Sequence, residues 1–329
     1  MTAAVGQGYR PGEWPPVHGF GKWHRAGRLP TRSNPESSSR PQPRPLVETP
    51  GPFLLTPPRA EEAPLVIDSP HSGMEWPADF RPLASRAAIL TTWDALVDEL
   101  WAGAPDVGAT LLAARFPRAY VDVNRAATDI DAEILDAPWP GPVSATDYTR
   151  RGMGLIRRYA LPGVPMYDRR LSVAEVRLRL DQCYHPYRDA LRRVLDDLHL
   201  RHGVVWHVDC HSMKSRGNEM NIDSGEARPD FVVSDRMGTT CDPEFTSWTA
   251  EFLRGLGYSV QINDPYKGGD LVAAFGVPSR RRHSLQIEIN RARYLDEAAC
   301  ERGTDFASAQ ASLTRYLAAA VTWIRTHSA

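Results

Sequence analysis

Two histidines and one glutamate occupy positions from which a folded chain could bring them together for metal-assisted chemistry. His71 follows a short apolar run at 65–68, within Ser-Pro-His-Ser-Gly, and His211 follows the apolar run 204–208, within Asp-Cys-His-Ser. Glu288 interrupts a third strand-like apolar stretch. Because open α/β sheets build their sites where strands end, we expect these three side chains to meet at one edge of a sheet.

Two imidazoles and one carboxylate make a three-ligand zinc site whose fourth position stays open for water. A further glutamate within reach of that water could take its proton and later deliver it to a leaving amine. Asp209 is expected to orient the neighbourhood of His211 as a hydrogen-bond acceptor. The structural alternatives are ordinary hydrogen-bonded histidines and an ion pair at Glu288, because a carboxylate inside an apolar strand is costly unless it is paired. His207, which lies within the strand, is the weaker candidate.

Arginines follow two of the strand-like runs. The segments 122–125 (Asp-Val-Asn-Arg) and 290–293 (Asn-Arg-Ala-Arg) each place a guanidinium just beyond a strand. The forked donors of Arg125 and Arg291 suit the carboxylate of a substrate. For Arg293, a surface ion pair is the alternative.

Hydrophobic periodicity outlines the elements that must position these residues. Apolar residues three or four apart predict helices over 84–103, 172–201, 243–256 and 303–326, the second with a kink at Pro186 and an end at Gly203. Short apolar runs predict strands at 65–68, 110–115, 119–123, 204–208, 231–234, 258–263 and 284–290. Helices that alternate with strands indicate an α/β layered fold with a mixed, largely parallel sheet. The segment 126–170 lacks periodicity, and a loop of that length is typical of a functional or covering segment.

Composition divides the chain into two parts. The 329 residues hold 39 basic and 40 acidic side chains. The first 45 residues have seven Lys and Arg against two acids, with eight prolines, six glycines and almost no aliphatic side chains. Such a segment cannot bury enough apolar surface to fold, so we predict a disordered tail at 1–45 and a single domain at 46–329. The acidic remainder offers no broad basic surface for nucleic acid.

Sequence features also limit the compartment and the kind of metal site. No run approaches the roughly 18 to 20 apolar residues that span a bilayer, and the N-terminal segment has no signal-peptide pattern. The four cysteines lie far apart without a CxxC pair. This spacing argues against a zinc ribbon and against a secreted disulfide framework, and it favours the cytoplasm. Any metal is therefore expected to be held by histidine and carboxylate.

The segments that carry these residues resemble the N-formylglutamate amidohydrolase (N-formylglutamate deformylase) family. The resemblance runs from about Leu65 to Glu297 and rests on seven segments in order. They are SPHSG at 69–73, DALVDEL at 94–100, GATLLAARFPRAYVDVNR at 108–125, YHPYRDAL at 184–191, RHGVVWHVDCHS at 201–212, DPYKGGDLVAAFG at 264–276 and LQIEINRARY at 285–294. Each segment is weak alone, but seven in order at compatible spacing are specific.

The resemblance implies a fold and a reaction. The fold is a three-layer α/β/α arrangement of the phosphorylase/hydrolase-like kind, akin to zinc carboxypeptidases. The reaction is the hydrolysis of N-formyl-L-glutamate to formate and L-glutamate, which is the last step of one route of histidine degradation. The expected partner is accordingly a small N-acyl amino acid.

The resemblance also implies roles for particular residues. Related amidases place a histidine, a carboxylate, a second histidine and a catalytic glutamate in this order. That order implies Zn²⁺, or another divalent metal, on His71, Asp94 and His211, with Glu288 as the general base. Glu75, four residues after His71, is the alternative carboxylate ligand.

Further residues are expected around this set. Asp209, Asp98 and Asp122 are expected to support the metal ligands. Because the implied substrate has two carboxylates, at least two cationic anchors are expected. They are Arg125 and Arg291, with Asn124 beside the first and with Lys267 and Arg293 behind them.

Two alternatives remain at this stage. Arg188 and Asp270 stand where the family commonly has histidine and tyrosine, and both changes favour an amidohydrolase of another N-acyl amino acid or small peptide. A non-catalytic binding protein that retains the fold, with the proline-rich tail as its interaction element, is the second alternative. A serine hydrolase is not expected, because the chain has no GxSxG nucleophile elbow.

Overall fold

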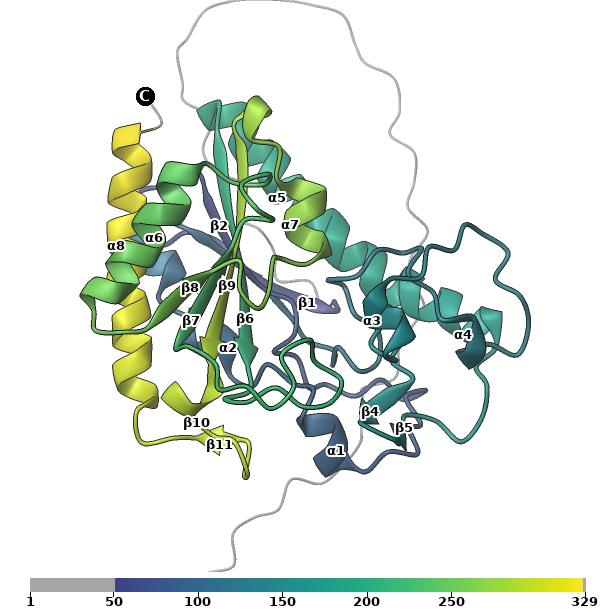
Figure 1. Cartoon of the computed structure of the whole chain (residues 1–329). Helices are drawn as coiled ribbons and strands as arrows, with labels where there is room; N and C mark the ends of the chain where they lie inside the picture. Colours follow the sequence, from purple (N-terminus) through teal and green to yellow (C-terminus); the bar gives the residue numbers. More distant parts are fainter. Residues whose placement is uncertain (1–50, 328–329) are drawn as a thin grey trace, which may run out of the picture. The chain divides into compact units, whose positions relative to one another are not determined.

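A seven-stranded mixed sheet forms the centre of the described structure. The structure, a computed structural model, describes residues 51–327 (Figure 1), so the tail predicted at 1–45 lies outside the described residues. The strand order is β1 (Phe53–Thr56), β3 (Thr110–Ala114), β2 (Leu65–Ser69), β6 (Val205–Met213), β9 (Arg282–Asn290), β7 (Phe231–Ser234) and β8 (Val260–Ile262). The four strands from β3 to β9 are parallel, and β1 and β7 pair with them in the antiparallel sense. The prediction of a mixed, largely parallel sheet is confirmed.

Helices cover both faces of this sheet. On one face lie α2 (Val97–Leu100), α6 (Pro243–Gly255) and α8 (Phe306–His327), and on the other lie α5 (His185–His202) and α7 (Asp270–Phe275) (Figure 1). Two separate apolar cores fill the spaces between the sheet and these helices. The three-layer α/β/α arrangement is therefore confirmed.

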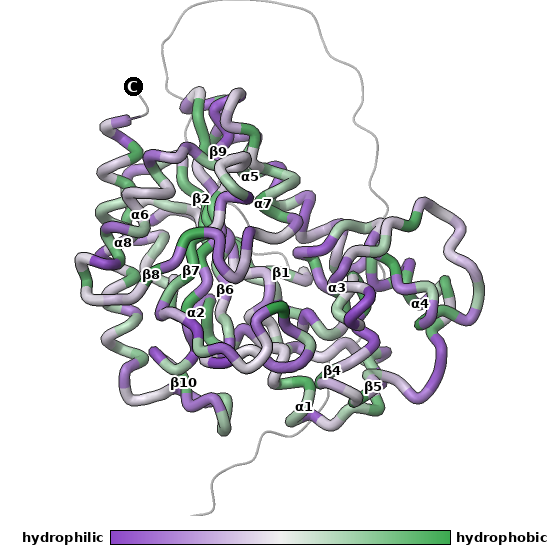
Figure 2. Tube along the Cα trace, viewed as in Figure 1, coloured by the Kyte–Doolittle hydropathy of each residue, from purple (hydrophilic) through white to green (hydrophobic). Residues whose placement is uncertain are grey.

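Figure 2 shows green, hydrophobic stretches along β2 and β7, as expected for strands that are buried on both faces. β2, β3 and β7 are buried at every residue. A parallel strand in this position needs a crossover connection, and α5 supplies the one that leads into β6. The left-handed Gly203, with φ of 71°, ends α5 directly before β6, as predicted.

The segment predicted to be a long covering loop folds against the α5 side of the sheet. Between β3 and α5 the chain makes the short elements α3 (Asp147–Arg150), β4 (Tyr159–Leu161), β5 (Val164–Pro165) and α4 (Val173–Arg179). Their apolar side chains belong to the same core as α5 and α7. The predicted helix over 172–201 is continuous, with a π turn at Leu180–Tyr184 directly before Pro186.

Two predicted elements are wrong. The helix expected over 84–103 is broken into α1 (Arg86–Leu90) and α2, because the backbone turns at 91–96 and Leu96 has a left-handed φ of 59°. The strand expected at 119–123 is an irregular segment. Its apolar side chains are buried, but its backbone bonds to Leu155 and to the side chain of Arg179 in place of a strand partner.

Two further observations bear on the expectations from composition. All four cysteines are free thiols, and three of them are buried. Within residues 51–327, every helix is too short or too polar to cross a bilayer.

Candidate active site

Polar side chains occupy alternate positions on one face of β6 and β9. On β6 they are His207, Asp209 and His211, and the residues between them point into the opposite apolar core. β9 runs parallel to β6, with Gln286 opposite Asp209 and Glu288 opposite His211. The pairing register thus brings the second histidine and the glutamate to neighbouring positions on the face covered by α5 and α7.

The two histidines come from different local structures. His71 lies in the turn that follows β2, as expected. The end predicted for the second strand at 208 is wrong, because β6 continues through His211 to Met213 and stays paired with β9 over its whole length. The backbone of His211 is therefore held by its pairing with β9, and both histidines are buried.

Asp94 reaches the site because the predicted helix is broken. Its backbone N–H donates to the carbonyl of His71 at 3.2 Å, and the indole of Trp93 donates to the carbonyl of Ser72 at 2.6 Å. These bonds fasten the break between α1 and α2 to the turn after β2. A regular helix through residue 94 would lose both contacts.

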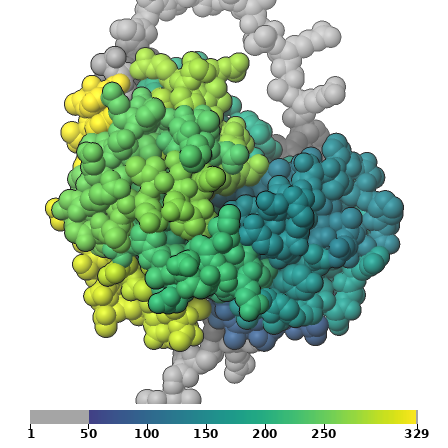
Figure 3. Space-filling model, viewed as in Figure 1, coloured from purple at the N-terminus to yellow at the C-terminus, as the bar shows by residue number. Residues whose placement is uncertain are grey.

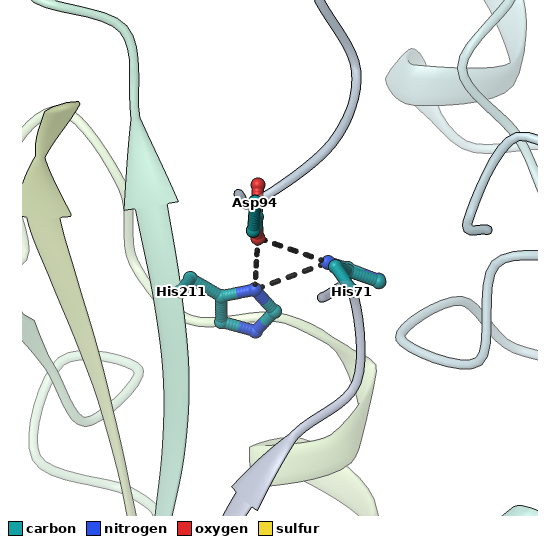
Figure 4. A group of neighbouring side chains, drawn as sticks. All are labelled: His71, Asp94 and His211. Atoms are coloured by element: carbon teal, nitrogen blue, oxygen red, sulfur yellow. Dashed lines mark hydrogen bonds and ion pairs between the residues drawn. The ribbon is translucent and has the colours of Figure 1, made fainter. Parts of the chain in front are cut away.

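Asp94, His71 and His211 converge on one point (Figure 4). The Nδ1 atoms of the two histidines are 3.1 Å apart, and Oδ2 of Asp94 lies 3.3 Å from Nδ1 of His71 and 2.9 Å from Nδ1 of His211. All three side chains are buried.

Each imidazole has an aspartate beside its other nitrogen. Nε2 of His71 lies 2.7 Å from Oδ1 of Asp122, and Nε2 of His211 lies 2.8 Å from Oδ1 of Asp209. A carboxylate only accepts hydrogen bonds, so Nε2 of His71 carries the proton. Nε2 of His211 lies 2.8 Å from both Oδ1 of Asp209 and Nδ2 of Asn124, and it has the same tautomer when its proton faces the aspartate. The Nδ1 lone pairs are then free. Asp209 and Asp122 therefore occupy the supporting positions predicted for them, the arrangement typical of metal-binding histidines.

This donor set fits a divalent metal. When each Nε2 carries its proton, two imidazole lone pairs and one carboxylate oxygen face each other, which is unfavourable unless a cation, either a metal ion or an added proton, lies between them. Tetrahedral zinc with bonds of about 2.0–2.1 Å places its ligand atoms about 3.3 Å apart. The observed separations of 2.9 to 3.3 Å match that requirement.

Glu288 lies beside the group without joining it. It is buried, and Nε2 of Gln286 donates to its Oε1 at 2.9 Å. Burial raises the pKa of Glu288 to about 7, against the opposing charge of His211. A carboxyl group with this pKa exchanges protons near neutral pH, as a general base and acid must.

Two adjoining cavities of about 100 and 110 Å³ open at the group. The first is lined by Asp94 and the second by His71, His211 and Glu288, and they share Arg118 and Arg157. Both are bounded by residues 118–157 on one side and by residues 212–266 on the other. Figure 3 shows the teal and green surfaces of these two parts meeting.

The sequence relationship decides what kind of protein has this site. The family model for N-formylglutamate amidohydrolase matches residues 63–295. The chain belongs to this family. N-formylglutamate deformylase of Pseudomonas putida is 31% identical over 242 residues, which cover 71% of this chain and 82% of the relative. The deformylase of Pseudomonas aeruginosa is 30% identical over 240 residues, which cover 72% and 84%.

A solved structure agrees with the family. The crystal structure of N-formylglutamate amidohydrolase from Ralstonia eutropha JMP134 superposes with a TM-score of 0.81 at 44% identity, covering 84% of this chain and 99% of that chain. The chain is therefore an enzyme that hydrolyses an amide bond. The alternative of a non-catalytic binding protein is wrong.

In this member of the N-formylglutamate amidohydrolase family, the predicted anchors divide into two sets. Arg291 lines the first cavity and donates to Oδ1 of Asp94 at 3.1 Å, while Arg125 and Asn124 line the second. Lys267 is exposed and Arg293 is half-exposed and paired with Asp230, and neither lines a cavity. Both side chains extend into solvent, so their charges lie at the protein surface.

Asn124 lines the second cavity and also connects two parts of the structure. Its Nδ2 donates to Oδ2 of Asp209 at 2.9 Å, and its Oδ1 accepts from the backbone N–H of Leu271 at 2.8 Å. Asn124 thus ties the aspartate behind His211 to the first turn of α7.

Two other predicted carboxylates lie away from the convergent group. Glu75 is part-exposed and accepts from Nε of Arg115 at 2.6 Å, so it is not among the described residues that could hold a metal with the histidines. Asp98 lies in the first turn of α2. Burial raises the pKa of Asp98 to about 6, although a hydrogen bond with the hydroxyl of Ser72 acts to lower it.

The two family departures pair with each other. Nη1 of Arg188 lies 2.7 Å from Oδ2 of Asp270 and also donates to the carbonyl of Val123 at 3.0 Å. The negative charge of Asp270 is thereby paired with a cation. The pair connects α5 to the start of α7 and supports the backbone next to Asn124.

Sequence reasoning missed several cations that line the cavities. They are Arg118, Arg157, Lys214 and Arg228. Arg118 lies four residues before Asp122 and pairs with it at 2.8 Å, a spacing that could have been noticed. The others come from loops without periodic pattern, and only the folded arrangement brings them together.

Proposed function

We propose that this enzyme hydrolyses N-formyl-L-glutamate to formate and L-glutamate. The observation that carries the proposal is the convergent His71, Asp94 and His211 group beside a cavity rich in arginine. The first feature suits water-dependent cleavage of an amide, and the second suits a substrate with two carboxylates. The names of the relatives supply the specific amide.

His71, Asp94 and His211 would hold the metal, through Nδ1, Oδ2 and Nδ1 respectively. When bound there, Zn²⁺ or another divalent metal supplies a Lewis acid that lowers the pKa of water and polarises a carbonyl oxygen. Asp122 and Asp209 keep the two imidazoles in the tautomer that leaves Nδ1 free.

Glu288 moves the proton in this proposal. Its carboxylate takes a proton from the attacking water as the new bond to the formyl carbon forms. It then gives that proton to the amide nitrogen as the carbon–nitrogen bond breaks, because an amine leaves readily only when it is protonated. The pKa of about 7 suits both directions of transfer.

Cationic residues fix the substrate. Arg291 and Arg118 both lie near Oδ1 of Asp94, at 3.1 and 3.6 Å, which places their guanidinium groups next to the reacting amide. Arg125 stacks on the ring of Tyr148, with its guanidinium carbon 4.0 Å from the ring centre, in the wall of the second cavity. Positioned cations of this kind hold a carboxylate substrate in the geometry for attack.

The test combines metal analysis with a substrate panel. The purified enzyme is expected to contain about one divalent metal per chain, to lose activity with a chelator and to regain it with Zn²⁺. N-formyl-L-glutamate should be turned over faster than N-formylaspartate, N-acetylglutamate and N-formylmethionine, with equal amounts of formate and glutamate released. A clear preference for one of the other three substrates would assign the enzyme to another N-acyl amino acid. Full activity in metal-free enzyme would overturn the metal-dependent mechanism.

A further inference from the structure

The cavity next to Asp94 holds more positive charge than its own acids balance. Its lining includes five cationic side chains: Arg118, Arg157, Lys214, Arg228 and Arg291. Among the described residues that line it, Asp94 is the only carboxylate. A buried surplus of positive charge is unfavourable unless a carboxylate pairs with it.

Three of the five cations have carboxylate partners. Arg118 lies 2.8 Å from Asp122, and Arg291 lies 3.1 Å from Asp94. Arg228 makes two bonds to Asp223, at 2.6 and 2.8 Å. These three guanidinium groups are held in place by the protein and are partly neutralised.

Arg157 has no such partner. Its side chain is buried, with 7% of its surface exposed, and its Nε makes no hydrogen bond. No carboxylate within residues 51–327 lies at ion-pair distance from it, and it lines both cavities. Burial lowers its pKa to about 9, and the like charge of Arg118 acts in the same direction. A guanidinium in this state is stabilised by any carboxylate that enters the cavity.

Lys214 is the second cation without a carboxylate partner in the part of the chain that the structure describes. It lies just beyond the end of β6, three residues after His211. Burial lowers its pKa to about 8, and the neighbouring charges of Arg291 and Arg157 add to this. Lys214 and Arg157 thus face one cavity and repel each other until an anion separates them.

We propose that Arg157, together with Lys214, binds the carboxylate at the end of the substrate's amino-acid side chain and so selects substrates with acidic side chains. This inference rests on the proposed function, because it assigns one of the two carboxylates of that substrate. It makes Arg157 a residue that determines specificity, with no part in bond breaking.

The covalent structure of the substrate favours this assignment over the α-carboxylate. The α-carboxylate is attached to the carbon that bears the amide nitrogen, so it stays close to the reacting group and to Arg291 and Arg118. The side-chain carboxylate of glutamate lies two methylene groups further away. Among the described residues, no hydrogen bond or ion pair joins Arg157 or Lys214 to His71, Asp94 or His211, and both cations line the cavity next to Asp94.

The test compares N-formyl-L-glutamate with N-formyl-L-glutamine, which has the same shape and no side-chain charge. In the metal-loaded enzyme, Arg157→Met should lower kcat/KM for the glutamate substrate by about 10- to 100-fold, the effect of losing a charge-assisted hydrogen bond. The value for the glutamine substrate should change by less than about threefold, so the ratio between the substrates collapses. Lys214→Met should do the same to a smaller extent. Arg192→Met, at an exposed arginine paired with Asp189 on α5, is the matched control and should leave the ratio unchanged.

Two outcomes separate this inference from the proposed function. If the wild-type enzyme prefers N-formylglutamate and Arg157→Met keeps the full preference, then the assignment of Arg157 is wrong and the function stands. If the wild-type enzyme does not hydrolyse N-formylglutamate, the function itself fails. Arg157→Lys keeps a charge in the same place and should retain part of the preference, which provides a second measurement if the methionine variant does not fold.

Discussion

His207 and His211 lie on the same face of β6, four residues apart, and differ in what their second ring nitrogen meets. Nε2 of His207 lies 2.7 Å from Oδ1 of Asp68, and its Nδ1 lies 2.7 Å from the hydroxyl of Ser284. Tyr187 closes this group by donating to Asp68 at 2.9 Å. Every polar atom of the imidazole is therefore used, and the ring borders neither of the two cavities.

His211 has the same kind of aspartate partner, but its Nδ1 meets two other possible metal-ligand atoms instead of a hydroxyl group. Its Nδ1 faces Nδ1 of His71 and Oδ2 of Asp94, with no hydroxyl to share a proton. A buried histidine paired with an aspartate is thus found in both groups and indicates no function by itself. The difference that matters is that three possible metal-ligand atoms, from His71, Asp94 and His211, converge beside a cavity.

The largest expected effect comes from exchanging each histidine in turn. His211→Gln should remove the bound metal and lower kcat/KM by roughly 10³-fold or more, because a metal ion contributes several kcal/mol to such a reaction. His207→Gln should keep about one metal per chain, measured by elemental analysis, and should instead lower the free energy of unfolding. Loss of metal from a folded His207→Gln enzyme would show that the two groups are not separate.

Glu288 provides the next test, since it lies opposite His211 in the sheet register. Glu288→Gln should lower kcat by about 10² to 10⁴-fold, the usual contribution of a general acid–base group. Metal content should stay the same, because Glu288 is not part of the convergent group. Ser284→Ala is the matched change, because Ser284 lies opposite His207 as Glu288 lies opposite His211, and it should leave kcat within a few-fold of the wild type. A Glu288→Gln enzyme with normal kcat would require another base.

Most strands, and the polar residues that they bring together, could be predicted from sequence because buried parallel strands appear as apolar runs. Polar residues inside or directly after such runs, such as His211 and Glu288, are then conspicuous. The broken helix could not be predicted. Its apolar spacing is helical throughout, and the bonds from Asp94 and Trp93 to the turn after β2 depend on a contact between distant segments.

The lining of the two cavities was harder to predict than the group of His71, Asp94 and His211. Arg157 and Arg228 lie in irregular segments, where no periodic pattern indicates which way a side chain points. Lys267 and Arg293 lie in segments that match the family, and yet their side chains turn to solvent or to Asp230. Position after a strand indicates nearness to a site, but only packing decides which cations face it.

Asp209 and Asp68 offer a smaller test, because they are paired opposite each other in the register of β6 and β2. Asp209→Asn should weaken metal binding by about 10- to 100-fold, the usual effect of losing the carboxylate behind a metal-binding histidine. Asp68→Asn should leave metal affinity unchanged and destabilise the fold by roughly 3–5 kcal/mol, because it breaks a buried pair with His207. Metal titration and chemical unfolding of both variants measure the two effects. Equal metal affinities in the two variants would contradict the comparison.

The smallest expected effect is a pH dependence of kcat/KM that comes from Lys214, in the cavity next to Asp94. The group of His207, Asp68, Ser284 and Tyr187 borders neither cavity. Lys214 faces the first cavity among Arg157, Arg228 and Arg291, with Glu297 nearby. Burial and those arginine charges lower the pKa of Lys214 to about 8. Lys214 must be protonated to attract a carboxylate, so kcat/KM for N-formylglutamate should fall as pH rises through about 8, by at most tenfold per pH unit.

N-formylglutamine, which has no side-chain charge, separates this effect from the titration of other groups. Glu288 and the metal ligands act on N-formylglutamate and N-formylglutamine alike, so their contributions cancel in the ratio of the two kcat/KM values. That ratio should decline above pH 8 in the wild type, whereas in Lys214→Arg the decline should begin only as the pH approaches 9, the pKa of Arg157, because the guanidinium that replaces the amine keeps its charge at pH 8. A ratio that is level through pH 8 in the wild type as well would mean that Lys214 does not contact the substrate. Binding of the side-chain carboxylate would then depend on Arg157 alone.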